Sequence, residues 1–335
     1  MASIPIQNAV TAQPAEREYV IGLDLGGTNL KYGIISNFGE IVYKNFVPAE
    51  TQKGGRRVID VMKQAAYECL MFSKKENFSI KAIGAGCPGT IDSVNGRSLG
   101  PAPHIVEWEG VEITKPLSEI ARVPVFADND ANFMTYGETA WGAARGFRYV
   151  VGLTLGTGVG GGIVIDGSIY HGHLFNGAEL GHVVVEADGR PCACGNHGCL
   201  EKYVGAHAIV RDIIDAIDHG TKSSIMELVQ SKNDINPAWI FKAAELGDEL
   251  CTRIVNQMIQ YLGAGISSMV NVLSPEIVVI GGGMSDAGDD FIAKVREETL
   301  SRVMKPVKPH LKIVRAKLGN DAGIVGAGTW ALKKT

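Results

Sequence analysis

The sequence predicts an α/β protein built from two related halves. Apolar, strand-like segments alternate with segments of helical periodicity along the chain, and this alternation is typical of α/β folds. A Gly-rich hairpin pattern occurs twice, as YVIGLDLGGTN from Tyr19 and as YVVGLTLGTGV from Tyr149. The length of 335 residues is sufficient for two domains, each with its own core.

Composition and charge exclude several classes of protein. The net charge of −4 argues against nucleic-acid or membrane-surface binding, because both require a basic face. Residues 1–17, an expected flexible lead-in, show no signal-peptide pattern. The longest uncharged run, residues 149–165, is too short and too Gly-rich to span a membrane. We therefore expect a cytoplasmic protein without nucleic-acid or membrane partners.

The first half is predicted to begin with a hairpin and to continue with alternating helices and strands. The expected elements are a strand over 20–25, a return strand over 30–35, a helix over 56–75, a strand from 81 into a Gly/Pro turn, a strand from 124 and a helix over 132–144. The segment ADNDAN ends the last of these strands. Each of Asp128, Asn129 and Asp130 could cap the following helix.

The second half is predicted to repeat the hairpin and then to become mainly helical. The expected helices cover 205–218, 223–230, 237–246, 248–273, 291–304 and 321–334. Strands are expected from 275, ending at a Gly cluster, and over 310–316. All three Gly-rich turns thus follow strands, where ligands of α/β proteins bind.

The turn GTGVGG matches the dinucleotide pattern G-x-G-x-x-G at Gly156, Gly158 and Gly161, but its context excludes a Rossmann unit. A Rossmann turn leads into a helix, whereas GGIVIDGSIY is β-branched and carries an Asp-Gly hairpin signal. A Gly turn between two strands can still present backbone N–H groups to phosphate. We expect these turns to hold one nucleotide between two domains.

DLGGTN and ADNDAN each allow a structural and a functional interpretation. Asp24 is either a turn former or a residue near Mg²⁺, beside a turn that contacts phosphate. The ADNDAN carboxylates either cap a helix or take the proton from a hydroxyl that attacks phosphorus. Their place at strand ends favours a ligand site.

Three cysteines in the segment CACGNHGC indicate a metal site. Cys192, Cys194 and Cys199 form a Cys₃His set with either His182 or His197, which suits closed tetrahedral zinc. Three thiols leave one unpaired, and disulfides are disfavoured in a cytoplasmic protein. The segment carries too few basic residues for a nucleic-acid zinc module.

Together these motifs resemble the ROK family (repressors, open reading frames, kinases), in particular its bacterial glucokinases, from about residue 19 to 332. The most specific part is E-x-G-H followed by C-x-C-G-x-x-G-C-x-E, from Glu179 to Glu201. The resemblance implies a two-domain actin-like, RNase H-like fold with a zinc-binding loop. Residues 1–133 and a C-terminal helix at 318–335 would form a small domain, and 134–317 a large one.

The resemblance also assigns roles to individual residues. Asp130 would be the general base toward the sugar 6-hydroxyl. The sugar-binding residues would be Gly89, Asn129, Asp130, Glu179, His182 and Glu201. The structural zinc ligands would be His182, Cys192, Cys194 and Cys199. Mg-ATP would contact Asp24, Gly26, Gly27, Thr28, Gly156, Thr157, Gly158, Gly282 and Gly283.

The implied activity is ATP-dependent phosphorylation of glucose to glucose 6-phosphate, a glycolytic reaction, by a homodimeric enzyme. Many relatives have Asn where this chain has His104, and HIVEWEGVEI also resembles N-acylmannosamine kinases. N-Acetylmannosamine, N-acetylglucosamine, mannose and fructose are therefore alternative substrates, and polyphosphate is an alternative donor. A non-catalytic sugar-sensing regulator is the alternative of another class. The repressor form is not expected, because only about 18 residues precede the first strand, too few for a helix-turn-helix.

Overall fold

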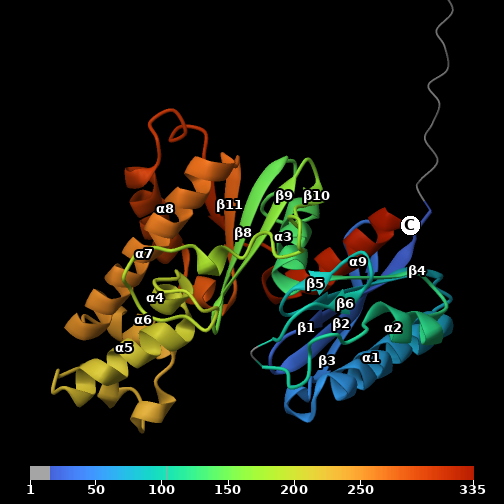
Figure 1. Ribbon diagram of the computed structural model, residues 1–335, viewed down its shortest axis with the longest axis horizontal. Helices are drawn as coiled ribbons and strands as arrows, with labels where there is room; N and C mark the ends of the chain where they lie inside the picture. Colours follow the sequence, from blue (N-terminus) through green and yellow to red (C-terminus); the bar gives the residue numbers. More distant parts are fainter. Residues whose placement is uncertain (1–15, 103) are drawn as a thin grey trace, which may run out of the picture.

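The computed structural model describes residues 16–102 and 104–335, so most of the predicted N-terminal lead-in lies outside the described residues. The described chain forms two lobes, each centred on a five-stranded sheet (Figure 1). Two helices, α3 (Asp130–Ala140) and α9 (Ala322–Lys334), lie between the sheets. No helix in the described part of the chain is long and apolar enough to cross a membrane.

The first sheet has the strand order β3-β2-β1-β4-β7. Its strands are β1 (Tyr19–Leu25), β2 (Asn29–Ser36), β3 (Ile41–Pro48), β4 (Ile80–Cys87) and β7 (Val125–Asn129). The first three are antiparallel, and β4 and β7 run parallel to β1. Helices α1 (Gly55–Lys75) and α2 (Thr114–Ala121) lie on one side of this lobe (Figure 1), and a short hairpin, β5 (Ile91–Asp92) and β6 (Arg97–Ser98), follows β4.

The second sheet repeats this topology in the order β10-β9-β8-β11-β12. Its strands are β8 (Tyr149–Leu155), β9 (Val159–Ile165), β10 (Ser168–Ile169), β11 (Ile277–Gly281) and β12 (Lys312–Arg315). As in the first sheet, an antiparallel hairpin precedes two parallel strands. The two predicted Gly-rich hairpins, β1–β2 and β8–β9, thus occupy equivalent positions in the two lobes.

The remaining helices cover the second sheet and form the largest apolar core cluster. They are α4 (Glu201–Val204), α5 (Ala206–Asp218), α6 (Pro237–Glu245), α7 (Glu249–Leu273) and α8 (Asp289–Arg302). The predicted helix over 223–230 was wrong, because only a single 3₁₀ turn forms there, at Ser224–Glu227. The Asp248 carboxylate accepts hydrogen bonds from the Ser223 hydroxyl and from the backbone and hydroxyl of Ser224, and so holds this segment as a loop.

Glycines allow the two central helices to approach the sheets and each other closely. A Cβ on Gly84 of β4 would lie 1.9 Å from the Ala327 carbonyl oxygen of α9. A Cβ on Gly152 of β8 would lie 2.1 Å from the Thr135 hydroxyl of α3. Because α3 packs on β8 and β9 as well as on α9, it connects the two lobes. The proposed domain boundary at residue 133 falls within α3 and stays a prediction.

Candidate active site and metal centre

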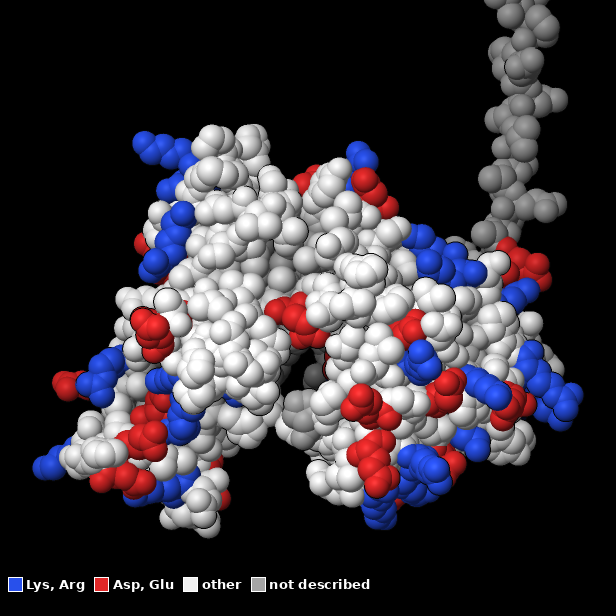
Figure 2. Space-filling model, in the orientation of Figure 1, with Lys and Arg blue, Asp and Glu red and all other residues white. Residues whose placement is uncertain are grey.

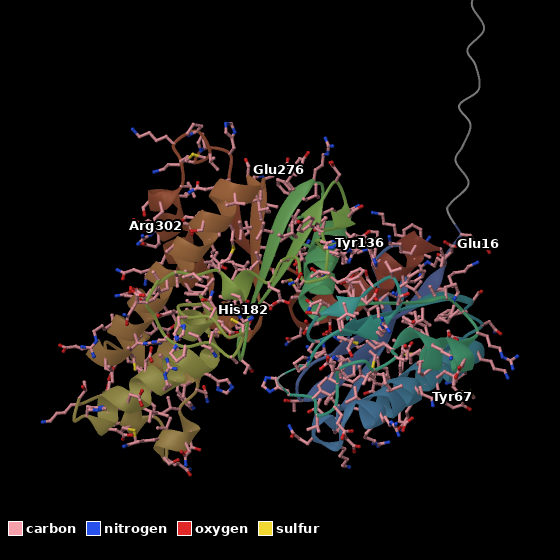
Figure 3. All side chains as sticks on the ribbon, viewed as in Figure 1. Glu16, Tyr67, Tyr136, His182, Glu276 and Arg302 are labelled. Carbon is pink, nitrogen blue, oxygen red and sulfur yellow. The ribbon has the colours of Figure 1, made fainter. Side chains whose placement is uncertain are left out.

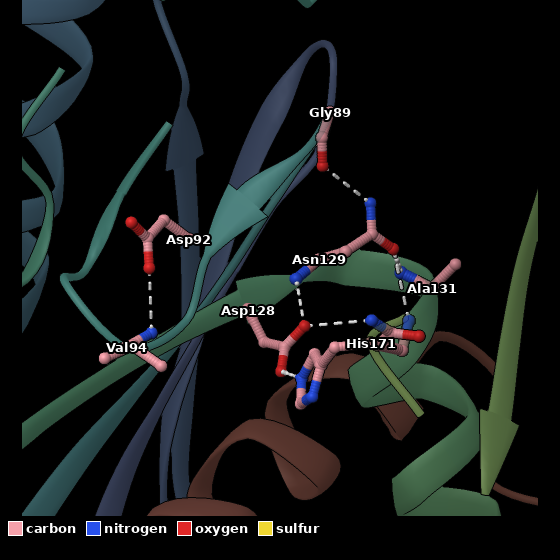
Figure 4. A network of polar contacts seen from close by, with 8 residues as sticks. Gly89, Asp92, Val94, Asp128, Asn129, Ala131 and His171 are labelled. Carbon is pink, nitrogen blue, oxygen red and sulfur yellow. Dashed lines mark hydrogen bonds and ion pairs between the residues drawn. The ribbon is translucent and has the colours of Figure 1, made fainter. Parts of the chain in front are cut away.

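The ends of β4 and β7 bring two predicted site segments together. Asn129 is the N-cap of α3, since its Oδ1 accepts from the backbone N–H groups of Ala131 (2.9 Å) and Asn132 (3.2 Å). Its Nδ2 donates to the Gly89 carbonyl oxygen at 3.1 Å (Figure 4). Gly89 has a φ of 82°, which favours glycine. Of the three possible caps, Asn129 takes this role, so neither neighbouring carboxylate is needed for it.

Asp130 follows the cap as the first residue of α3. Burial, together with the nearby carboxylates of Asp24 and, more weakly, Glu179, raises the pKa of its carboxyl to about 7. The Ala131 backbone N–H, 2.9 Å from Oδ1, acts in the opposite direction on the pKa. A carboxyl with a pKa near neutrality is suited to accept a proton during a reaction at physiological pH.

Asp24 lies at the end of β1, beside the first turn of α9. Burial raises the pKa of its carboxyl, and the Lys31 ammonium, 3.8 Å from Oδ2, opposes this shift. A Cβ on Gly323 would lie 2.5 Å from the Asp24 carboxyl carbon, so glycine at this position leaves space for the carboxylate. The following turn is closed by a 2.9 Å hydrogen bond from the Gly26 N–H to the Asn29 carbonyl. Asp24 therefore adjoins both the first Gly-rich turn and Asp130.

The second and third Gly-rich turns lie side by side at the end of the second sheet. A Cβ on Gly282, whose φ is 84°, would lie 2.4 Å from the Leu155 carbonyl oxygen. The turn after β8 is closed by a 3.0 Å hydrogen bond from the Gly156 N–H to the Gly158 carbonyl. By contrast, a Cβ on Gly156 or Gly283 would meet no described atom within 4 Å. These two glycines thus border open space, as a ligand-binding turn requires.

The predicted metal ligands form one cluster. One ligand atom each from His182, Cys192, Cys194 and Cys199 lies within 4.8 Å of the other three. His182 Nδ1 is 3.6 Å from Cys192 Sγ, and Cys194 Sγ is 3.6 Å from Cys199 Sγ. Tetrahedral zinc with bonds of about 2.0–2.1 Å to nitrogen and 2.3 Å to sulfur gives N–S and S–S separations of about 3.6 and 3.8 Å. The set therefore fits zinc, and His182, not His197, completes it.

The metal cluster adjoins two carboxylates. His182 turns Nδ1 toward the thiols, while its Nε2 lies 4.0 Å from Glu179 Oε2. Glu201 Oε1 lies 3.4 Å from Cys192 Sγ. Glu201 also reaches the second Gly-rich turn, since a Cβ on Gly158 would lie 3.0 Å from its Oε2. His182 faces the space between the lobes in Figure 3, and Figure 2 shows a deep notch at this place on the surface.

Two contacts of the site could not be inferred from the sequence, which singled out His104 only as a departure from the family pattern. The ring of His104 lies 3.5 Å from where a Cβ on Gly27 would stand, so His104 borders the first Gly-rich turn. His171 Nε2 lies 2.5 Å from Asp128 Oδ2 (Figure 4). His171 is 43 residues from Asp128 along the chain, and neither residue type nor spacing indicates this contact.

The chain is similar in sequence and fold to known glucokinases and in sequence to a known repressor. A model described as the ROK family matches residues 20–334. A glucokinase from Thermotoga maritima is 36% identical over 310 residues, which cover 92% of this chain and 96% of that protein. A xylose repressor from Caldicellulosiruptor bescii is 28% identical, over 92% of this chain and 76% of the repressor. The crystal structure of a ROK family glucokinase from Streptomyces griseus in complex with glucose and AMPPNP has a TM-score of 0.81 and 29% identity, and covers 94% of this chain and 99% of that one. The similarity confirms the predicted actin-like α/β architecture.

Proposed function

The chain belongs to the ROK family, and from this premise we propose that it is an ATP-dependent hexose kinase whose substrate is glucose. The observation that carries the proposal is Asp130, a carboxyl with a pKa near 7 beside residues suited to bind a sugar. Each of the three Gly-rich turns suited to phosphate follows a strand, and the second and third follow neighbouring strands of the second sheet, β8 and β11. The relatives named glucokinase, one of them in complex with glucose and AMPPNP, support the same substrates.

In the proposed reaction, Asp130 accepts the proton of the sugar 6-hydroxyl as that oxygen attacks the γ-phosphorus of ATP, and the bond between this phosphorus and the bridging oxygen breaks to release ADP. Phosphoryl transfer depends mainly on positioning and on stabilisation of negative charge. Asn129, whose amide joins the cap of α3 to the Gly89 turn, holds one side of the sugar. On the other side of the sugar, Glu179 and Glu201 accept hydrogen bonds from its hydroxyl groups, and His182 donates one to a sugar oxygen.

Zinc would be structural in this scheme. Four protein ligands leave no open position for a reactive water, so the ion would fix the loop that carries Glu179 and Glu201. With Nδ1 directed to the thiols, the His182 Nε2–H is oriented toward the sugar side. Asp24 is the proposed neighbour of Mg²⁺. The nucleotide would contact Gly26, Gly27, Thr28, Gly156, Thr157, Gly158, Gly282 and Gly283.

A coupled assay of ADP release across glucose, mannose, fructose, N-acetylglucosamine and N-acetylmannosamine tests the proposal. Glucose should give the highest kcat/KM; a higher value for another sugar would keep the kinase and change its substrate. The N-acetylated sugars are included because His104 stands where many relatives have Asn and because its segment resembles N-acylmannosamine kinases. Replacement of ATP by polyphosphate in the same assay identifies the donor.

A non-catalytic regulator is the second candidate, because a xylose repressor is also similar over most of this chain. The presence of Asp130 with its raised pKa favours catalysis, since a sugar sensor needs no general base. Absence of ADP release with all five sugars, together with measurable sugar binding, would favour the regulator. Cytoplasmic location stays a prediction that cell fractionation can test, and a homodimeric state stays a prediction that a size measurement in solution can test.

A further inference from the structure

The loop of residues 170–178 connects the second sheet to the predicted sugar-binding carboxylate Glu179. It follows β10, whose Ile169 is buried in a core cluster with Tyr136 and Trp330. At its start, His171 Nε2 contacts Asp128 Oδ2 at 2.5 Å (Figure 4). Asp128 belongs to β7 of the first sheet, so this contact joins the two sides of the proposed sugar site.

Asp128 fixes the turn that presents Asp130. Its side chain is 1% exposed, and its Oδ1 accepts from the Asn129 backbone N–H at 2.8 Å and from Asn132 Nδ2 at 2.9 Å. The two donors belong to residues at the start of α3, one before and one after Asp130 in the sequence. The remaining oxygen, Oδ2, is the one that His171 contacts. One buried carboxylate therefore receives contacts from both sides of the site.

The loop is closed in a way that links His171 to Glu179. The Gly177 N–H donates to the His171 carbonyl oxygen at 2.8 Å, which brings the two ends of the loop together. A Cβ on Gly177 would lie 2.7 Å from the His171 carbonyl carbon, so this closure requires glycine. The Leu180 N–H then donates to the Ala178 carbonyl at 2.7 Å. A displacement of His171 would therefore move the backbone on which Glu179 stands.

We propose that His171 is a positioning residue: its contact with Asp128 sets the distance between Asp130 and Glu179, and hence the orientation of the sugar 6-hydroxyl. This inference rests on the proposed kinase function. His171 touches neither the sugar nor the nucleotide in this scheme. It acts through Asp128 on the general base and through the 170–178 loop on the opposite carboxylate.

The competing explanation is that His171 only satisfies a buried carboxylate and thereby supports the fold. The two roles differ in what they change. Loss of fold support would lower the stability of the protein and would weaken the binding of sugar and of ATP together. Loss of positioning would raise the KM for sugar and lower kcat, while the KM for ATP stays unchanged, because the Gly-rich turns lie outside this network.

Three variants separate these roles. His171→Leu removes the donor, His171→Gln places an amide nitrogen near the position of Nε2, and His173→Leu is a matched control at an exposed histidine of the same loop. We expect kcat/KM for glucose to fall about 10- to 100-fold in His171→Leu, the range for a small misplacement of reacting groups. His171→Gln and His173→Leu should stay near wild type, and zinc content should be equal in all four proteins.

The outcomes are distinct. Wild-type kcat and sugar KM in folded His171→Leu would overturn the positioning role, and so would an equal loss of sugar and ATP affinity. Failure of His171→Gln to recover activity would also overturn it, because the proposed role needs only the donor. Wild-type protein that phosphorylates none of the five sugars would overturn the proposed function and this inference with it. An active wild type with an equally active Leu variant would overturn this inference alone.

Discussion

Replacement of Asp130 by asparagine should remove most of kcat and, at the same time, stabilise the protein at neutral and higher pH. Burial and the Asp24 carboxylate raise the pKa of Asp130 from 3.8 to about 7, so the folded protein disfavours the charged form. In unfolded protein the carboxyl has its ordinary pKa. Each pKa unit corresponds to about 1.36 kcal/mol, so the shift of about three units costs about 4 kcal/mol when the group is ionised. Contact with solvent in the cleft reduces this to about 2–4 kcal/mol.

The pH dependence follows from the direction of the shift. Below pH 3.8 the carboxyl is neutral in both states, and Asp130 carries no electrostatic cost. As the pH rises, the unfolded state loses its proton first, so the folded state becomes relatively less stable until the pH passes about 7. The difference in unfolding free energy between Asp130→Asn and wild type should therefore grow from about 0.5 kcal/mol at pH 4 to its full value at pH 8.

Urea unfolding at pH 4, 6 and 8 measures this difference directly. At pH 8, the expected gain corresponds to a rise in Tm of about 3–6 °C for a chain of this length, taking roughly 2.1 cal/mol/K per residue. Asp60→Asn, at an exposed carboxylate of α1, is the matched control and should change stability by less than about 0.5 kcal/mol. At the same time, kcat of Asp130→Asn should fall about 10²–10⁴-fold, the usual range for a lost general base.

Two results would refute this reasoning. A variant that is no more stable than wild type at pH 8 would show that Asp130 is not held in an unfavourable charged state. A variant that keeps kcat within a few-fold of wild type would remove Asp130 from the role of base. In wild type, the acid limb of kcat/KM should lie near pH 7, the pKa of the free enzyme. An acid limb near pH 4 would contradict the pKa shift independently of any variant.

Three further predictions concern the nucleotide, the metal and the backbone. Gly156→Val, whose side chain would project into open space, should weaken ATP binding and leave sugar binding intact in calorimetry, and loss of both would argue against a phosphate turn. Gly158 is unsuitable for this test because a side chain added there would meet Glu201. Cys194→Ser should reduce the zinc content below the expected one ion per chain and should raise the KM for sugar more than the KM for ATP, whereas the control His197→Gln should change neither. Zinc-free, folded protein with unchanged sugar affinity would leave zinc only a distant structural role. Ala178→Gly should stabilise the protein by about 0.5–1 kcal/mol in urea unfolding, because Ala178 has a φ of 69°, a backbone conformation that strains alanine but not glycine. The control Ala216→Gly, within α5, should cost about 1 kcal/mol, and a destabilised Ala178→Gly would contradict the assigned strain.

The sequence predicted those parts of the fold that depend on local periodicity and turn chemistry. The strand, Gly turn and return strand from Tyr19 and Tyr149 became two equivalent hairpins. The long helix over 248–273 was predicted from its apolar spacing and forms as α7, with Asp248 as its N-cap. The segment 223–230 was predicted as a helix for the same reason, but a side chain 24 residues away, Asp248, ties it down as a loop. The helix propensity of a segment depends on its own residues and therefore cannot predict such a distant contact.

The site divides in the same way between local and distant information. The spacing of the three cysteines, Cys192, Cys194 and Cys199, indicates a metal site. The residues alone left open whether His182 or His197 is the fourth ligand, because this depends on how the 3₁₀ turn at Leu180–His182 orients the His182 ring. Asp130 could be named from its place after a strand, whereas its raised pKa depends on burial in the folded chain and on Asp24 and Glu179, more than 40 residues away in either direction. His171 shows the limit most clearly. It carries no motif, and only the pairing of two lobes places its ring against Asp128. A residue of this kind changes the geometry of a reaction without touching a substrate, so the structure, and not the sequence, is where it becomes visible.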